Sequence, residues 1–67
     1  MSYKYIRFFA IAGRMQWDSV KDDKDLEKRI VSSFDTSERQ KFDDERNALE
    51  TPGGFVLISD CAIVRVA

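Results

Sequence analysis

Histidine is absent from this chain, and cysteine occurs only once, at Cys61. Without histidine the chain cannot build a Ser-His-Asp or Cys-His catalytic pair, and it lacks the commonest general base at neutral pH. The usual histidine-containing ligand sets for zinc and copper are also excluded, and one cysteine cannot form an intrachain disulfide. We therefore expect a protein that is not an enzyme and that holds no metal and no cofactor.

Long apolar runs are missing as well. The longest unbroken one, residues 8–12, is far shorter than the roughly 20 residues that span a bilayer. The N-terminal residues lack the basic segment and apolar run of a secretion signal, and a lone cysteine is typical of a reducing compartment. These absences predict a soluble cytoplasmic protein with no membrane partner.

Charge is nearly balanced, with a net value of −1 over 67 residues. This balance argues against a general nucleic-acid binder, whose affinity would come from neutralising phosphates. The distribution is uneven, because residues 1–17 carry Lys4, Arg7 and Arg14 without an acid, whereas residues 18–50 have an acidic excess. The sequence thus predicts a basic N-terminal segment joined to an acidic helical middle.

The N-terminal third reads as a β-hairpin followed by a helix. Residues 3–9 are rich in aromatic side chains, Gly13 can supply a turn, and residues 14–17 resume an alternating pattern. The polar residues 18–25 offer helix N-caps, and apolar residues then recur at helical spacing, which predicts a first helix over residues 23–33.

A second helix is expected over residues 37–49. Ser37 with Gln40 fits a capping box, and Asp35 with Glu38 offers the same geometry. Since no glycine or proline separates the two helices, one bent helix is the alternative. The second helix has a narrow apolar seam, so we expect it to be peripheral.

The C-terminal segment reads as two strands, because Pro52, Gly53 and Gly54 end the helix and apolar residues follow. Ser59 and Asp60 predict a tight turn between strands at 55–59 and 62–66, with one long bulged strand as the alternative. The expected fold class is α+β: a small two-layer single domain over residues 1–67, with a four-stranded antiparallel sheet, two helices on one face and the order ββααββ.

The strands are apolar on both faces, yet the chain has helices for only one face. The sequence leaves open which face of each strand points inward, and our predicted core is Ile6, Phe8, Met15, Trp17, Leu26, Ile30, Phe34, Phe42, Leu49, Phe55, Leu57 and Ile63. The opposite side chains, Val56, Ile58, Val64 and Val66, continued by Phe9 or Tyr5, would form an apolar surface that serves as an oligomer interface. Small domains are marginally stable alone, so we expect a homo-oligomer, in the simplest case a homodimer.

The remaining candidate site is an acidic cluster in the second helix, formed by Asp43, Asp44 and Glu45, which we expect to contact a protein partner. The leading functional hypothesis is a small protein-protein interaction module that inhibits or modulates a larger host or defence complex by covering part of its surface. In general character the chain is similar to phage or mobile-element accessory proteins, although no motif carries that similarity.

The alternative hypothesis is single-stranded nucleic-acid binding. Tyr5, Arg7 and Phe9 share one face of the first strand, and interleaved aromatic and basic groups on a sheet can stack bases and bind phosphates. The net acidity of the chain weighs against this hypothesis.

Overall fold

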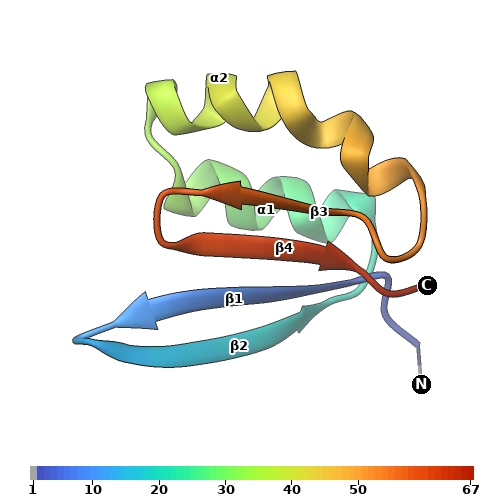
Figure 1. Ribbon diagram of the computed structural model, residues 1–67, viewed down its shortest axis with the longest axis horizontal. Coiled ribbons are helices and arrows are strands. Elements are labelled where there is room, and N and C mark those ends of the chain that lie inside the picture. Colours follow the sequence, from blue (N-terminus) through green and yellow to red (C-terminus); the bar gives the residue numbers. More distant parts are fainter. Residues whose placement is uncertain (1) are drawn as a thin grey trace.

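The computed structural model describes residues 2–67, which form a sheet with a helical layer on one side (Figure 1). The elements in chain order are β1 (Tyr5–Ile11), β2 (Arg14–Val20), α1 (Asp23–Ser33), α2 (Thr36–Glu45), the 3-10 helix η1 (Arg46–Glu50), β3 (Phe55–Ile58) and β4 (Cys61–Arg65). All neighbouring strands are antiparallel, and their spatial order is β2-β1-β4-β3. The predicted α+β class and the order ββααββ are confirmed.

The β1–β2 hairpin closes through Ala12 and Gly13, whose φ angles are 51° and 76°. Positive φ at both central residues is typical of the tight turn that matches the twist of two antiparallel strands. β4 pairs with β1 only from Tyr5 to Phe9, so the hairpin extends past the pairing with β4. Its tip therefore projects beyond the β3–β4 turn (Figure 1).

The helical region contains two helices, and the alternative of one bent helix is wrong. Phe34 is extended and donates its N–H to the Ile30 carbonyl, which ends α1. Asp35 then caps α2, because its carboxylate accepts from the Glu38 N–H at 2.8 Å while the Glu38 side chain accepts from the Asp35 N–H at 3.0 Å. Of the two capping boxes that the sequence offered, this one forms.

The predicted second helix, residues 37–49, changes type along its length. Its α-helical part ends at Glu45, and the remaining residues form the tighter η1. After η1 the chain reverses closely at Gly54, where a Cβ atom would lie 1.8 Å from the Ala48 carbonyl oxygen. Glycine is therefore required at this position for β3 to begin directly beneath η1.

The last two strands form the expected tight hairpin. Ile58 and Cys61 are register partners, and Ser59 adopts a positive φ of 54° in the two-residue turn. The alternative of one long bulged strand is wrong.

The core lies between the helices and one face of the sheet, which we call the inner face. Its buried members are Tyr5, Val20, Leu26, Ile30, Phe42, Leu49, Val56, Ile58 and Ile63, with Phe34 and Cys61 packed against them. The helical part of the predicted core is confirmed, as is Ile63. The other strand residues predicted for the core, Ile6, Phe8, Met15, Trp17, Phe55 and Leu57, have the opposite parity and lie on the other face.

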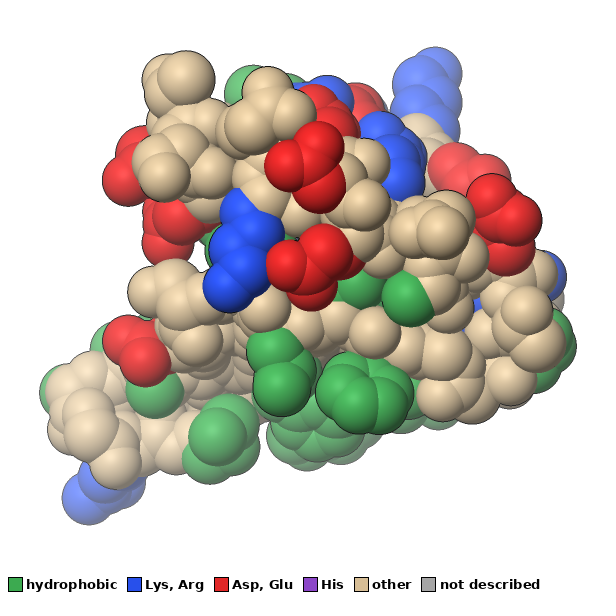
Figure 2. Space-filling model, turned by 45° about the horizontal axis from the view of Figure 1, so that its top comes forward, with side chains coloured by type: hydrophobic (Ala, Val, Ile, Leu, Met, Phe, Trp, Pro, Cys, Tyr) green, Lys and Arg blue, Asp and Glu red, His purple; other side chains and the backbone are tan. Residues whose placement is uncertain are grey.

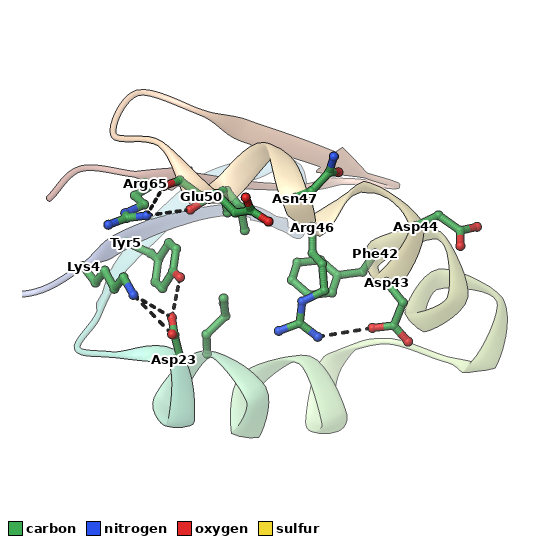
Figure 3. Close-up of a pocket in the computed structure, with 12 residues that line it drawn as sticks. Lys4, Tyr5, Asp23, Phe42, Asp43, Asp44, Arg46, Asn47, Glu50 and Arg65 are labelled. Atoms are coloured by element: carbon green, nitrogen blue, oxygen red, sulfur yellow. Dashed lines mark hydrogen bonds and ion pairs between the residues drawn. The ribbon is translucent and has the colours of Figure 1, made fainter.

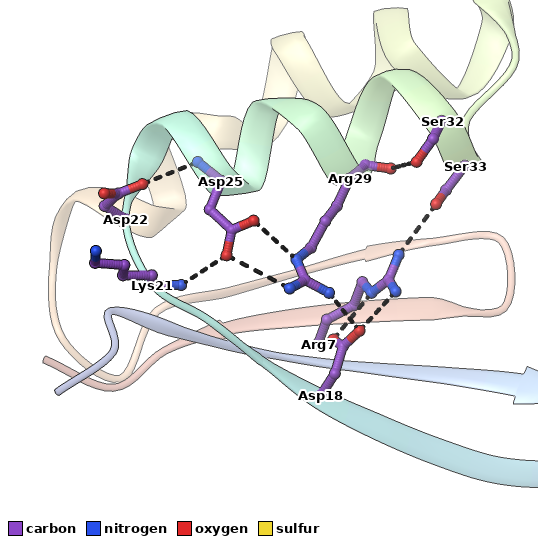
Figure 4. Close-up of polar contacts among 8 residues, drawn as sticks. All are labelled: Arg7, Asp18, Lys21, Asp22, Asp25, Arg29, Ser32 and Ser33. Carbon is purple, nitrogen blue, oxygen red and sulfur yellow. Dashed lines mark hydrogen bonds and ion pairs between the residues drawn. The ribbon is translucent and has the colours of Figure 1, made fainter. Parts of the chain in front are cut away.

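The inner face holds charged residues because their charges pair there (Figure 4). Arg7 donates to both oxygens of Asp18, at 3.2 and 2.8 Å, and Arg29 of α1 reaches the same carboxylate at 2.6 Å. Arg29 also pairs with Asp25, and Arg7 donates to the Ser33 hydroxyl at 3.0 Å. These bonds connect β1, β2 and α1, which fixes the helix over this half of the sheet.

Candidate functional site

The face of the sheet opposite the helices is the most unusual surface of the molecule, and we call it the outer face. The strand register places these side chains on it: Ile6, Phe8, Ala10, Met15, Trp17, Ser19, Phe55, Leu57, Ala62 and Val64. All of them except Ser19 are apolar, and none is ionisable. Because cross-strand neighbours project to the same side of a sheet, these residues form one continuous surface.

Large side chains of the outer face are open to solvent. The exposed fractions are 69% for Met15, 63% for Trp17, 57% for Leu57 and 56% for Phe55. In Figure 2 most of the hydrophobic side chains in view gather along the lower side of the molecule. A single exposed leucine is ordinary, but a contiguous group of this kind marks an interaction surface.

The residues predicted for the oligomer interface divide between the two faces of the sheet, and their role in association stays a prediction. Val64 lies on the outer face, and Val66, past the end of β4, is 43% exposed. Val56 and Ile58, however, are buried against the helices, at 2% and 1% exposure. The outward positions of β3 are Phe55 and Leu57, because every second residue of a strand points to the same side.

The outer face is not flat. A hollow of about 260 Å³ opens beside Ala62 and is lined by Phe8, Met15 and Leu57. The β3–β4 turn, with Ser59, Asp60 and Cys61, forms its remaining wall. Ala62 is the register partner of both Phe8 and Leu57, so a small side chain stands between two large ones. This alternation of large and small side chains makes the surface uneven, so that a partner of complementary shape can pack into the hollow.

The predicted base-stacking face is not open, because Tyr5, Arg7 and Phe9 lie on the inner face under the helices. Tyr5 is 5% exposed, and its hydroxyl donates to Asp23. The Arg7 guanidinium pairs with Asp18 and lies over the Phe9 ring at 4.4 Å from its centroid. Tyr5 and Arg7 are therefore engaged in contacts within the protein. Because Tyr5 and Phe9 lie on the inner face, they do not belong to the apolar outer surface to which they were assigned.

The acidic cluster Asp43–Glu45 lies at the C-terminal end of α2. Asp43 pairs with Arg39 at 3.2 Å and with Arg46 at 3.5 Å, and Asp44 accepts from Gln40 at 3.0 Å. Asp43 and Asp44 are exposed, whereas Glu45 is half-buried. Since much of this charge is compensated locally, the cluster is a weaker recognition feature than its sequence indicates.

A groove of about 390 Å³ lies between the start of α1 and the α2–η1 segment (Figure 3). Its cationic groups already have partners: Lys4 pairs with Asp23 at 3.2 Å, and Arg65 donates to the Leu49 and Glu50 carbonyls. Arg46 pairs with Asp43 and stacks on Phe42. The groove thus offers a ligand no uncompensated cation.

Titration adds little chemistry to the described residues. Burial raises the pKa of the Cys61 thiol, which makes it a poorer nucleophile at neutral pH. Among residues 2–67, no cluster of three or more histidine, cysteine, aspartate or glutamate side chains is placed to hold a metal ion. No helix in that range has the length and apolar character to cross a membrane.

Comparison with known proteins gives no assignment: no family model matches the chain, and neither a curated protein nor a solved structure matches it. The outer face is therefore identified on physical grounds alone. Sequence reasoning expected such a face but missed Trp17, Met15, Phe55 and Leu57 as its members. No signal in the sequence identified them, because Arg14, Gln16 and Asp18 form the polar alternate set of β2, and that pattern favours an inward Trp17.

Proposed function

We propose that this protein is a non-enzymatic protein-interaction module whose binding surface is the outer face. The observation that carries the proposal is the group of large apolar side chains, Met15, Trp17, Phe55 and Leu57, each more than half exposed on one continuous face. Proteins that act alone rarely leave contiguous apolar patches beyond about 300 to 600 Å² open to water, and this face is of that size or larger.

Covering the outer face is energetically favourable. Apolar surface removed from water contributes about 25 cal/mol per Å², so covering this face would yield several kcal/mol before the costs of association are subtracted. On the helix side, by contrast, several of the charged groups pair with one another, as in the contacts of Asp18 and Asp43. A module of this kind acts by occupying a surface, and inhibition or modulation of a larger complex by occlusion is the corresponding mode of action.

Site-specific photocrosslinking tests this proposal. The photoreactive residue benzoylphenylalanine is placed at position 17 or, as a matched control, at position 31, because Val31 is 66% exposed but lies on α1. Cells expressing each variant are irradiated, and the adducts are identified by mass spectrometry. We expect defined protein adducts from position 17 and none from position 31; equal adduct patterns, or lipid adducts alone, would contradict the proposal.

A further inference from the structure

We infer that the outer face is covered by a second copy of this chain, packed sheet to sheet across a two-fold axis that runs parallel to the strands between β1 and β4. The inference rests on the proposed function and names the partner of the same surface. Two sheets that pack face to face lie about 10 Å apart and bury their facing side chains between them.

The first argument is the polarity of the face. Its members are all apolar except Ser19, and none carries a charge. Surfaces that bind a foreign partner reversibly are about as polar as the rest of a protein, whereas the interfaces of homodimers are more apolar. A face this poor in polar groups matches the composition of a homodimer interface, and a second copy is present whenever the chain is made.

The area of the outer face also fits a dimer. Met15, Trp17, Phe55 and Leu57 are each more than half exposed. Side chains of this size give the face on the order of 700 Å² of apolar surface, close to the ~800 Å² that each partner contributes to a stable interface. The solvent-accessible surface of the described chain is 4622 Å², so covering the outer face would remove a substantial part of it from water.

The third argument is the order of side-chain sizes across the face. The strand register defines two rows that cross all four strands, read from β2 to β3: Ser19, Ile6, Val64 and Phe55 in one, and Trp17, Phe8, Ala62 and Leu57 in the other. Ala10 and Met15 pair beyond the end of β4 and belong to neither row. A two-fold axis between β1 and β4 places β1 of one copy opposite β4 of the other, and β2 opposite β3. Each row then faces the same row of the second copy, in reverse order. Ser19 then opposes Phe55 of the second copy, and Phe8 opposes its Ala62.

These pairings match small side chains with large ones. The Phe8 ring of one copy enters the hollow beside Ala62 of the other, and Ser19 leaves room for Phe55. Ile6 meets Val64, and Trp17 meets Leu57, so no position brings two small or two of the largest side chains together. Alternation of large and small residues is what lets facing layers interdigitate at the density of a protein interior.

The test begins with light scattering over about a hundredfold range of protein concentration. We expect the mass of a dimer that dissociates on dilution. Trp17→Lys and Leu57→Lys each place a charge on the outer face, and we expect either change to weaken self-association by at least about a hundredfold. Val31→Lys is the matched control and should leave the dimer intact, with circular dichroism confirming that all three variants are folded.

The position of the axis is tested by exchanging two side chains. Ser19 and Phe55 stand on the two edge strands, β2 and β3, so they cannot touch within one chain. We expect Ser19→Phe and Phe55→Ser each to weaken the dimer by about tenfold, and the double variant to recover most of that loss because the opposed sizes are only swapped. Additive losses in the double variant would overturn this axis.

The fluorescence of Trp17 shows whether the outer face is covered. As the only tryptophan, it should be protected from acrylamide quenching in concentrated protein and become accessible on dilution. A monomer at every concentration, or a dimer that survives both lysine variants, would overturn the inference. In either case a foreign protein crosslinked to position 17 would still support the proposed function. A monomer whose Trp17 is buried only by phosphatidylcholine vesicles would overturn both proposals.

Discussion

At the scale of single residues, Tyr5 is the most strongly perturbed group. It lies at the junction of β1 with the start of α1, where burial and the hydrogen bond to Asp23 raise the pKa of Tyr5 to about 12. The same hydrogen bond, together with Lys4, lowers the pKa of Asp23. A raised folded-state pKa means that the contribution of neutral Tyr5 to stability is complete below pH ~10 and is lost as the pH rises toward 12.

This shift can be measured directly, because Tyr3 and Tyr5 are the only tyrosines. In a Tyr3→Phe variant, the ultraviolet absorbance of tyrosinate reports Tyr5 alone. We expect a titration midpoint near 12 in the folded protein and near the ordinary value of about 10 in concentrated urea. Asp23→Asn in the same background should lower the folded midpoint, since it removes a negative charge and a charged acceptor. A folded midpoint near 10 would show that Tyr5 is solvated.

At the scale of elements, the sequence predicted the helices better than the faces of the strands. Leu26 and Ile30 recur at helical spacing and are the side chains that α1 buries, and Phe42 of the apolar seam is the one that α2 buries. The strands carry apolar residues at both parities, so alternation could not identify the inner face. On β3 we predicted that Phe55 and Leu57 point into the core, but Val56 and Ile58 do so. The predicted inner face of this strand is therefore reversed.

The physical reason for the reversal is the pairing of charge on the inner face. An isolated charge is costly to bury, so the charges of Arg7 and Asp18 by themselves disfavour an inward position. They are register partners, however, and α1 adds Arg29 to the same carboxylate. Part of β2 also extends beyond the core, so Arg14 and Gln16 share the parity of Asp18 but remain exposed. These contacts between distant residues are invisible in a single sequence.

The network around Asp18 should be a structural link between β2 and α1. Asp18→Asn removes the charge that two guanidinium groups share, in a site where the Arg7 side chain is only 15% exposed. We expect a loss of about 1 to 2 kcal/mol in the free energy of unfolding, measured with urea.

The matched control is Asp43→Asn, which also removes a carboxylate paired with two arginines but at 41% exposure. Its expected cost is below about 0.5 kcal/mol, and that cost should shrink in high salt. Equal costs for the two substitutions would show that the Asp18 network adds nothing beyond an ordinary surface ion pair.

At the scale of the whole molecule, the two layers have different surroundings. The helices cover the inner face, and the outer face is left as an apolar surface with no covering element among residues 2–67. A second copy on the outer face would leave the helical layers pointing away from each other. Asp43 and Asp44 would then be displayed on both sides of the dimer, where they remain the predicted contact for a further protein partner.

If a second copy completes the burial of this small domain, folding and association must be coupled. A dimer that unfolds to two chains has a melting temperature that rises with concentration, by about 5 °C per tenfold for a chain of this length. We expect this dependence for the wild type and for Val31→Lys, measured by calorimetry. Trp17→Lys should melt at a lower temperature that does not change with concentration. A dimeric wild type whose melting temperature is independent of concentration would show that association does not stabilise the fold, because only a coupled transition obeys mass action.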